Sequence, residues 1–370
     1  MKKFLKKKVS IIRKYFPLFS VIIFIGFSPF PAFTQKIEKK GHFRTSFPVK
    51  EKKTSRKPYS PPPFARGPAS RKMSFPQKRE SRSLLQEPAS RGSNRMGLIL
   101  IDPFSDLPLV HNYWVEQWIQ AFQSRYSSRF RLWLERSYRY IPMMKEIFKK
   151  QNLPEDLAYL AMIESGFSSG AISSAQAVGY WQFIKATASR FGLREASWLD
   201  ERKDFEKSTY AASQYLRFLY KQFGDWYLAA AAYNMGEQKL TRLIKKYKTK
   251  NFWSLAQKYD FPYETGQYVP QLIAAITIAK APPLYGFNYL KIKEPYTYEI
   301  FYLPGGTNLR LLASYIKEPY KKIKTLNPAL LRDSIPRYIE HWRTRIPKGS
   351  SKKVSQYVNT YLISSLSKDH

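Results

Sequence analysis

The stretch that decides the fold is NLPEDLAYLAMIESGFSSGAISSAQAVGYWQF, which spans residues 152–183. Pro154 suits the first turn of a helix, and the two acidic residues that follow it favour the positive end of a helix. The pair Ser165 and Gly166 is typical of a helix end. The sequence therefore predicts a helix from Pro154 to about Glu164, with this glutamate as its last residue.

Glu164 stands where the apolar face of this predicted helix would continue. Leu153, Leu157 and Leu160 recur at helical steps, and Glu164 follows four residues after Leu160. Desolvation on an apolar face and the negative end of a helix both disfavour the ionised carboxyl, so we expect its pKa to be raised. A glutamate of this kind can donate a proton near neutral pH. The alternative is an ordinary helix-end glutamate with its carboxylate in water.

Four motifs then follow in order along the chain. They are ESGF (164–167) with the nearby Ser173, AVGYWQF (177–183), AAYNMGE (231–237) and YETGQYVP (263–270). In these motifs and their flanks the sequence resembles the family 1 lytic transglycosylases of peptidoglycan, and the likeness extends over residues 104–348. The resemblance implies a mainly α protein with a lysozyme-like catalytic domain, which we place at residues 101–290 together with N-terminal packing helices.

The resemblance also implies the chemistry. Glu164 is expected to protonate the oxygen of the β-1,4 bond between N-acetylmuramic acid and N-acetylglucosamine. As a carboxylate it then takes the proton of the C6 hydroxyl, which attacks C1 and leaves a 1,6-anhydromuramic acid end. Peptidoglycan glycan strands are therefore the expected partner. Two rivals remain open: a lysozyme-type muramidase that admits water, and a non-catalytic peptidoglycan-binding protein.

Six further residues are implied to bind the glycan. They are Ser173, Gln182, Tyr233, Asn234, Glu264 and Tyr268. Residue types alone leave other interpretations open. Tyr233 and Asn234 end a small-residue helix and could simply cap it, while Glu264 and Tyr268 could be an exposed pair on a helix over 265–280.

Helical patterns cover most of the expected catalytic domain. We predict helical structure over residues 112–150, 181–191, 208–223, 226–234 and 265–280. No cofactor is implied, and no metal site either, because the histidines are widely scattered and no H-E-x-x-H motif occurs. Those histidines are His42, His111, His341 and His370.

The N-terminal hundred residues look like a targeting signal and a linker. A basic start and an apolar run predict an export signal or an uncleaved membrane anchor at residues 1–34, which places the protein in the periplasm or cell envelope. Residues 35–100 are rich in Pro, Ser, Lys and Arg and predict a disordered linker. The first hundred residues hold 24 Lys and Arg against four acids, and the whole chain carries +36. This arm could meet an anionic membrane surface or remain a solvated arm without a partner, and we expect no nucleic acid.

The chain is also without cysteine, so it can form neither a disulfide framework nor a thiolate metal site.

The sequence predicts a small α+β unit in the C-terminal part. Residues 295–350 resemble a single LysM-like repeat, a strand-helix-helix-strand unit that binds N-acetylglucosamine chains, and a purely structural extension is the alternative. Residues 351–370 form a tail. Because every expected site residue precedes Pro270, we expect removal of residues 298–370 to leave turnover of soluble glycan near its original rate.

Overall fold

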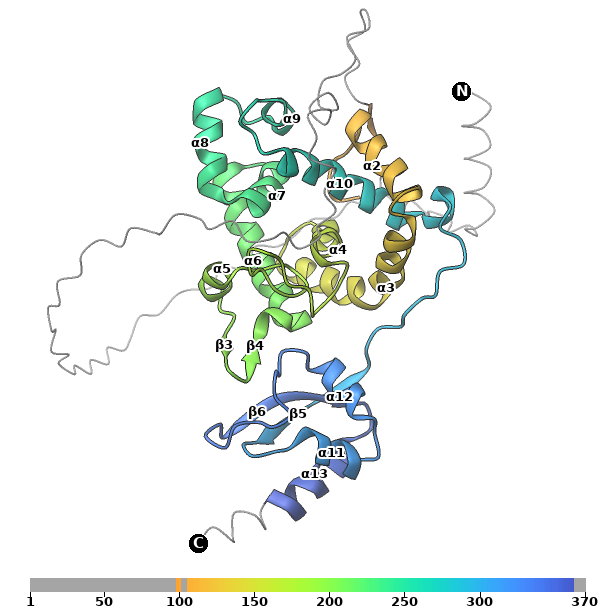
Figure 1. The fold of residues 1–370 in the computed structure, drawn as a ribbon, viewed down its shortest axis with the longest axis vertical. Coiled ribbons are helices and arrows are strands. Elements are labelled where there is room, and N and C mark those ends of the chain that lie inside the picture. The colour runs from red at the N-terminus through yellow and green to blue at the C-terminus, as the bar shows by residue number, and fades with distance from the viewer. Residues whose placement is uncertain (1–97, 101–104, 363–370) are drawn as a thin grey trace, which may run out of the picture. The chain divides into compact units, whose positions relative to one another are not determined.

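The computed structural model describes residues 98–100 and 105–362 (Figure 1). The predicted export signal at 1–34 and almost all of the predicted linker at 35–100 lie outside the described residues. Within the described part, every helix is too short or too polar to cross a membrane.

Two helices, α2 (Tyr113–Gln123) and α3 (Ser127–Lys150), come first. The predicted helical structure over 112–150 is confirmed, apart from a break at residues 124–126. Several aromatic residues at helical spacing face the core, as expected for such a pattern, whereas Tyr138 is exposed. The buried rings that join the two helices are Trp118, Phe122, Phe130 and Trp133.

The segment with the candidate carboxylate is less regular than predicted. It opens as the 3-10 helix η2 (Glu155–Tyr159) and becomes α-helical only in α4 (Leu160–Ser165). The prediction of one α-helix starting at Pro154 is therefore wrong in its first turn. At the other end Gly166 is the C-cap with a φ of 59°, so Glu164 is the last residue but one of α4.

A buried carboxylate fixes the irregular first turn. Asp156 is 1% exposed, and its oxygens pair with the ammonium groups of Lys145 at 2.9 Å and Lys280 at 2.6 Å. Burial alone would raise the pKa of Asp156, but the bonds from the two lysines outweigh it and hold this pKa below its ordinary value. Asp106 accepts the backbone N–H of Asp156 at 3.1 Å. These contacts tie the start of the segment to α3 and to the end of α10 (Tyr263–Lys280).

The remaining helices complete the helical region. They are α5 (Lys185–Arg190), α6 (Phe205–Phe223), α7 (Trp226–Met235), α8 (Glu237–Tyr247), α9 (Phe252–Ala256) and the 3-10 helix η4 (Pro282–Tyr285). Helix α10 packs against α2, α4 and α7 (Figure 1). The four alanines at 229–232 are buried in α7, and their small size lets α6 and α10 approach it closely.

Of the five helical segments predicted outside 154–164, three agree with the structure and two differ. The helices predicted at 226–234 and 265–280 are confirmed to within two residues at each end. Helix α6 starts three residues earlier than predicted, because Asp204 accepts the backbone N–H of Glu206 at 3.0 Å and caps it. The predicted helix at 181–191 is reduced to α5, since residues 179–182 form turns and Phe183 forms an antiparallel bridge with Val178.

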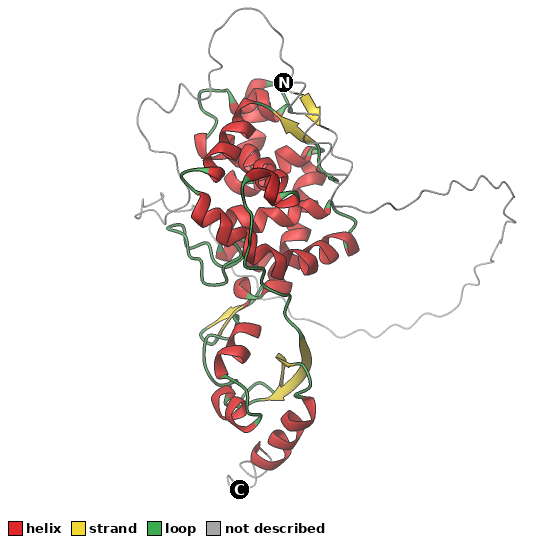
Figure 2. Ribbon diagram, turned by 90° about the vertical axis from the view of Figure 1, so that its right-hand side faces the viewer, coloured by secondary structure: helices red, strands yellow, loops and turns green. Residues whose placement is uncertain are grey.

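The strands are few and short (Figure 2). Two small antiparallel pairs accompany the helices: β1 (Leu98–Leu100) with β2 (Leu109–His111), and β3 (Glu195–Ala196) with β4 (Leu199–Asp200). A single turn of 3-10 helix, η3 (Glu201–Lys203), leads from β4 to the cap of α6.

The C-terminal segment folds in the order strand, helix, helix, strand. Strands β5 (Tyr298–Pro304) and β6 (His341–Pro347) pair antiparallel, with Tyr298 opposite Pro347. Between them lie α11 (Leu309–Tyr315) and α12 (Tyr320–Leu326), and after β6 come α13 (Ser351–Tyr357) and a π-helical turn over Val358–Leu362. We call residues 298–362 the C-terminal module. Its relation to LysM repeats stays a prediction.

The module shares its core with the helical region. Trp198 and Leu199 belong to the same buried cluster as Leu303, Leu312 and Ile346 of the module. The backbone of Leu199 also forms an antiparallel bridge with Leu330. The sequence did not predict this contact, because the residues that meet are more than a hundred positions apart.

Candidate active site

The candidate site centres on the hydrogen bond between Glu164 and Tyr268. The Tyr268 hydroxyl donates to Glu164 Oε1 at 2.6 Å. Glu164 is half-buried at the end of α4, while Tyr268 is 5% exposed in the second turn of α10. Because α4 packs against α10, two segments 104 residues apart hold this pair together.

Two phenols lie beside the carboxylate, that of the buried Tyr268 and that of the partly buried Tyr233. Burial, followed by the negative charge of Glu164, raises the pKa of Tyr268 well above its ordinary value, and the same two causes raise the pKa of Tyr233. Both phenols are therefore neutral at physiological pH. A neutral donor stabilises the charged form of the carboxyl, but it does not hold the carboxyl in that form as a neighbouring cation would. The predicted rise in the pKa of Glu164 stays a prediction.

Tyr233 and Asn234 lie in the last turn of α7 and have separate contacts. The Tyr233 hydroxyl donates to the carbonyl oxygen of Trp181 at 2.7 Å. Asn234 Oδ1 accepts the Thr265 hydroxyl at 2.7 Å, which joins α7 to α10. The alternative that this pair merely caps the helix is wrong, since the C-cap of α7 is Gly236.

Glu264 is exposed in the first turn of α10, one turn before Tyr268. Its negative charge is near enough to contribute to the raised pKa of Tyr268. The four-residue spacing therefore places both side chains on the same face of α10, and the alternative of an exposed pair is wrong for Tyr268, which is buried.

Ser173 and Gln182 lie on one loop, residues 171–183, which we call the cleft loop. The buried Ser173 hydroxyl accepts the backbone N–H of Ala177 at 3.0 Å. The Gln182 amide donates to the carbonyl oxygens of Ala171 at 3.2 Å and Gly179 at 3.0 Å, from a residue with a φ of 48°. Both side chains thus stabilise the loop itself, a role that sequence reasoning missed. In Gln182 the amide oxygen remains as a further acceptor.

The cleft loop is attached directly to the helix of the carboxylate. The Ser165 hydroxyl donates to the carbonyl oxygen of Tyr180 at 2.8 Å and accepts the N–H of Ser168 at 3.2 Å. At Gly166 a Cβ would lie 2.0 Å from the Trp133 indole nitrogen, so only glycine fits between α4 and α3. The helix end, the loop and α3 therefore form one support for Glu164.

The contacts of several residues of this site carried no sequence signal. Thr265 and Ser165 are small polar residues inside recognised motifs, and only the fold shows what they bind. Trp133 lies in the predicted helical segment 112–150, but its contact with Gly166 depends on tertiary packing.

Comparison with known proteins shows what parts of the chain are similar to. Residues 142–256 match the family described as the transglycosylase SLT domain. Over 200 residues the chain is 35% identical to membrane-bound lytic murein transglycosylase D of Escherichia coli, strain K12, and equally to that of strain O6:H1. Each alignment covers 52% of this chain and 43% of the relative, so the chain spans less than half the length of these curated relatives.

A solved structure is also similar in part. It is the 70 kDa soluble lytic transglycosylase Slt70 of E. coli, with 20% identity and a TM-score of 0.36, covering 49% of this chain and 31% of that one. The matched family segment contains Glu164, the cleft loop and α7. Residues 142–256 therefore match the transglycosylase SLT domain, and the chain is similar to lytic murein transglycosylase D along about half of its own length.

Proposed function

We propose that this protein is a peptidoglycan lytic transglycosylase. It cleaves the β-1,4 bond between N-acetylmuramic acid and N-acetylglucosamine without water and leaves 1,6-anhydromuramic acid ends. The observation that carries the proposal is the half-buried Glu164, which lies in the matched segment 142–256 and accepts a hydrogen bond at 2.6 Å from the buried phenol of Tyr268. The names of the relatives in E. coli support the same reaction.

Glu164 acts first as an acid and then as a base. Its proton goes to the glycosidic oxygen as the bond from that oxygen to C1 breaks. The resulting carboxylate takes the proton of the C6 hydroxyl while the C6 oxygen forms a new bond to C1. The Tyr268 hydroxyl holds the carboxyl through Oε1 during these proton transfers. The carboxyl ends in its starting state.

One carboxylate is enough for this reaction. Ordinary glycosidases use two, the second as a nucleophile or as a base for water. Here the sugar's own hydroxyl replaces water, and its proton returns to the group that gave one up. The fold that presents this carboxylate is lysozyme-like in our proposal.

The glycan strand is bound by residues around this pair. We assign Ser173, Gln182, Tyr233, Asn234, Glu264 and Tyr268 to substrate binding. Support comes from their positions on the cleft loop and on the turns of α7 and α10, from the hydrogen bond of Tyr268 to Glu164, and from the closeness of Tyr233 to the charge of Glu164.

Residues outside the domain set where the enzyme acts. The basic, apolar start at 1–34 directs export to the cell envelope, and the arm at 35–100 meets an anionic membrane surface. The C-terminal module is a LysM-like glycan-binding unit, a reading supported by its strand-helix-helix-strand order.

The product of digestion tests the proposal. Purified sacculi are digested with the full chain and with Glu164→Gln, and the released fragments are identified by mass spectrometry. We expect anhydro ends from the unaltered protein and none above background from the variant. Reducing ends would instead establish the muramidase, and sacculus binding without any release would establish a non-catalytic binding protein.

A further inference from the structure

The cleft loop rests on a buried arginine outside the described site. Arg202 is 8% exposed, and its Nη1 donates to the carbonyl oxygens of Gln176 at 3.3 Å and Phe183 at 3.4 Å. Between these two residues, a Cβ on Gly179 would lie 2.1 Å from the carbonyl oxygen of Arg202. One residue therefore contacts the loop at three points along its second half.

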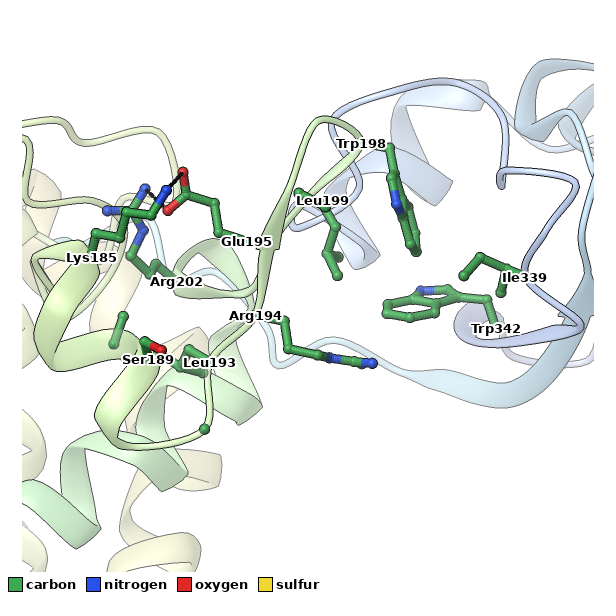
Figure 3. Close-up of a pocket in the computed structure, with 13 residues that line it drawn as sticks. Lys185, Ser189, Leu193, Arg194, Glu195, Trp198, Leu199, Arg202, Ile339 and Trp342 are labelled. Carbon is green, nitrogen blue, oxygen red and sulfur yellow. Dashed lines mark hydrogen bonds and ion pairs between the residues drawn. The ribbon is translucent and has the colours of Figure 1, made fainter. Parts of the chain in front are cut away.

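The rest of the Arg202 guanidinium is held by carboxylates. Nε donates to Asp200 Oδ1 and Nη2 to Oδ2, both at 2.9 Å, and Glu195 lies 3.4 Å from Nη2. Figure 3 shows Arg202 beside Glu195 and Lys185 at the edge of a cavity of about 490 Å³. A planar fork can bind a carboxylate with two donors and still direct a third at backbone carbonyls. Lysine offers one point charge and cannot do both.

The C-terminal module fixes the backbone on which this fork depends. The N–H of Asp200 donates to the carbonyl oxygen of Ala329 at 2.9 Å, and the N–H of Leu331 donates to that of Trp198 at 2.7 Å. Strand β4 is thus paired with β3 and also with residues 329–331 of the module. The position of the Asp200 carboxylate is therefore set in part by the module.

A second contact holds the other side of η3. Arg345 of β6 is 2% exposed, and its two terminal nitrogens donate to the two oxygens of Asp204 at 2.7 and 2.9 Å. Its guanidinium also lies 4.2 Å from the centre of the Phe205 ring. Asp204 follows Arg202 by two residues, so the module holds this single turn from Asp200 to Asp204.

We propose that Arg202 is a positioning residue for the glycan and that the module acts on the reaction by holding Arg202 in place. The inference rests on the proposed function, since the loop matters through Ser173 and Gln182. In this view the module completes the cleft and is more than a tether to the wall. The expectation that residues 298–370 can be removed without loss of soluble turnover is opposed by these contacts.

The first test compares two arginines of the same cavity. Arg202→Lys keeps the charge and loses the fork, so we expect KM for soluble glycan chains to rise about tenfold, the scale of one lost charge-assisted hydrogen bond, with kcat changed less. Arg194→Lys is the matched control. Arg194 pairs with Glu201 at 2.9 Å and extends toward Trp342 (Figure 3), so the KM of Arg194→Lys should match that of the unaltered protein.

Hydrogen exchange supplies a readout independent of activity. Amides of residues 171–183 should exchange at least about tenfold faster in Arg202→Lys than in Arg194→Lys. Unchanged exchange and unchanged KM in Arg202→Lys would overturn the proposal. A lower kcat at constant KM would also overturn it, since that pattern reports a smaller folded fraction. Failure of the unaltered protein to form anhydro ends would reject the proposed function and leave the exchange result standing on its own.

The part played by the module is tested with Arg345→Lys. If the module acts through Arg202, this variant raises KM in the same direction, and the double variant with Arg202→Lys raises it by less than the product of the two single effects. Two effects that multiply in full would show that Arg345 and Arg202 act independently, and the module would then play no part in holding Arg202.

Discussion

Glu164 and Asp204 are carboxylates at opposite kinds of helix end, and their surroundings differ accordingly. Glu164 lies in the last turn of α4, where the helix dipole disfavours negative charge, and the donor it meets at 2.6 Å is the neutral phenol of Tyr268. Asp204 lies at the start of α6, where the dipole favours negative charge, and it meets the guanidinium of Arg345 at 2.7 Å.

The difference separates a carboxyl that exchanges its proton from one that keeps its charge. Burial alone would raise the pKa of Asp204, but Arg345 outweighs it and holds this pKa below the ordinary range. Such a group is a poor proton donor at neutral pH. A carboxyl supported by uncharged phenols at a helix C-terminus can adopt both states during a reaction, as the proposed mechanism requires.

The largest effect is expected when Glu164 loses its transferable proton. We expect Glu164→Gln to lower turnover of sacculi by at least about a hundredfold, because a general acid and base contributes on that scale. The amide keeps the shape of the side chain, so the melting temperature should stay within a few degrees. Retained turnover at an unaltered melting temperature would exclude Glu164 as the catalyst.

The reverse experiment removes the cation beside Asp204. Arg345→Met should lower the free energy of unfolding by about 3–5 kcal/mol, since it leaves a buried charge without its partner. Arg343→Met is the matched control: Arg343 is partly exposed and lies 3.4 Å from Glu206, and such a pair contributes at most about 1 kcal/mol. Urea denaturation of both variants measures the difference. Equal losses would show that the buried pair is no stronger than the surface pair.

A smaller effect is expected from the phenol that supports Glu164. Tyr268→Phe removes a donor to the charged form of the carboxyl, so kcat should fall about tenfold. The alkaline limb of the pH–rate profile should also move to higher pH, because the carboxylate loses stabilisation. Tyr233→Phe provides the comparison, since Tyr233 donates to the Trp181 carbonyl and should move that limb less. Identical profiles for the two variants would contradict the role given to Tyr268.

The smallest effect concerns acid stability. The folded pKa of Asp204 lies below its ordinary value of 3.8, so the pair with Arg345 stabilises the fold fully above that pH and less as pH falls through the folded pKa. The free energy of unfolding should therefore decline from about pH 4 downward. In Asp204→Asn this decline should be shallower, as chemical denaturation at a series of pH values would show. An unchanged slope would mean that other carboxylates dominate the decline.

Local sequence signals predicted the helix ends of the site well. Gly166 and the acidic turn after Pro154 marked the two ends of the segment, and the end of α4 differs from the prediction by one residue. The first turn was missed, because Asp156 bonds to lysines in other helices. The start of α6 was also predicted too late. The prediction followed the spacing of apolar residues, and that spacing does not reveal an N-cap residue such as Asp204.

Long-range contacts were the limit of the prediction. The resemblance to a family brought Glu164 and Tyr268 together, although neither residue's local pattern points to the other. The pairing of Asp204 with Arg345, which lie 141 residues apart, had no signal of any kind, because a single arginine in a strand is usually exposed. The internal hydrogen bonds of Ser173 and Gln182 were likewise hidden, since both residue types are equally common in loops and in sugar sites.

The core shared by Trp198, Leu199 and the module has a consequence for recombination between relatives. A chimera joined near residue 295 would combine a module from another protein with the hairpin of this one. Trp198 and Leu199 would then pack against module residues that do not fit them. A transferable unit would have to include the hairpin at 194–200 as well as residues 298–362. These two segments are separated by most of the helical region. The module therefore cannot be exchanged alone without loss of packing, and the residues of the hairpin and of the module must change together.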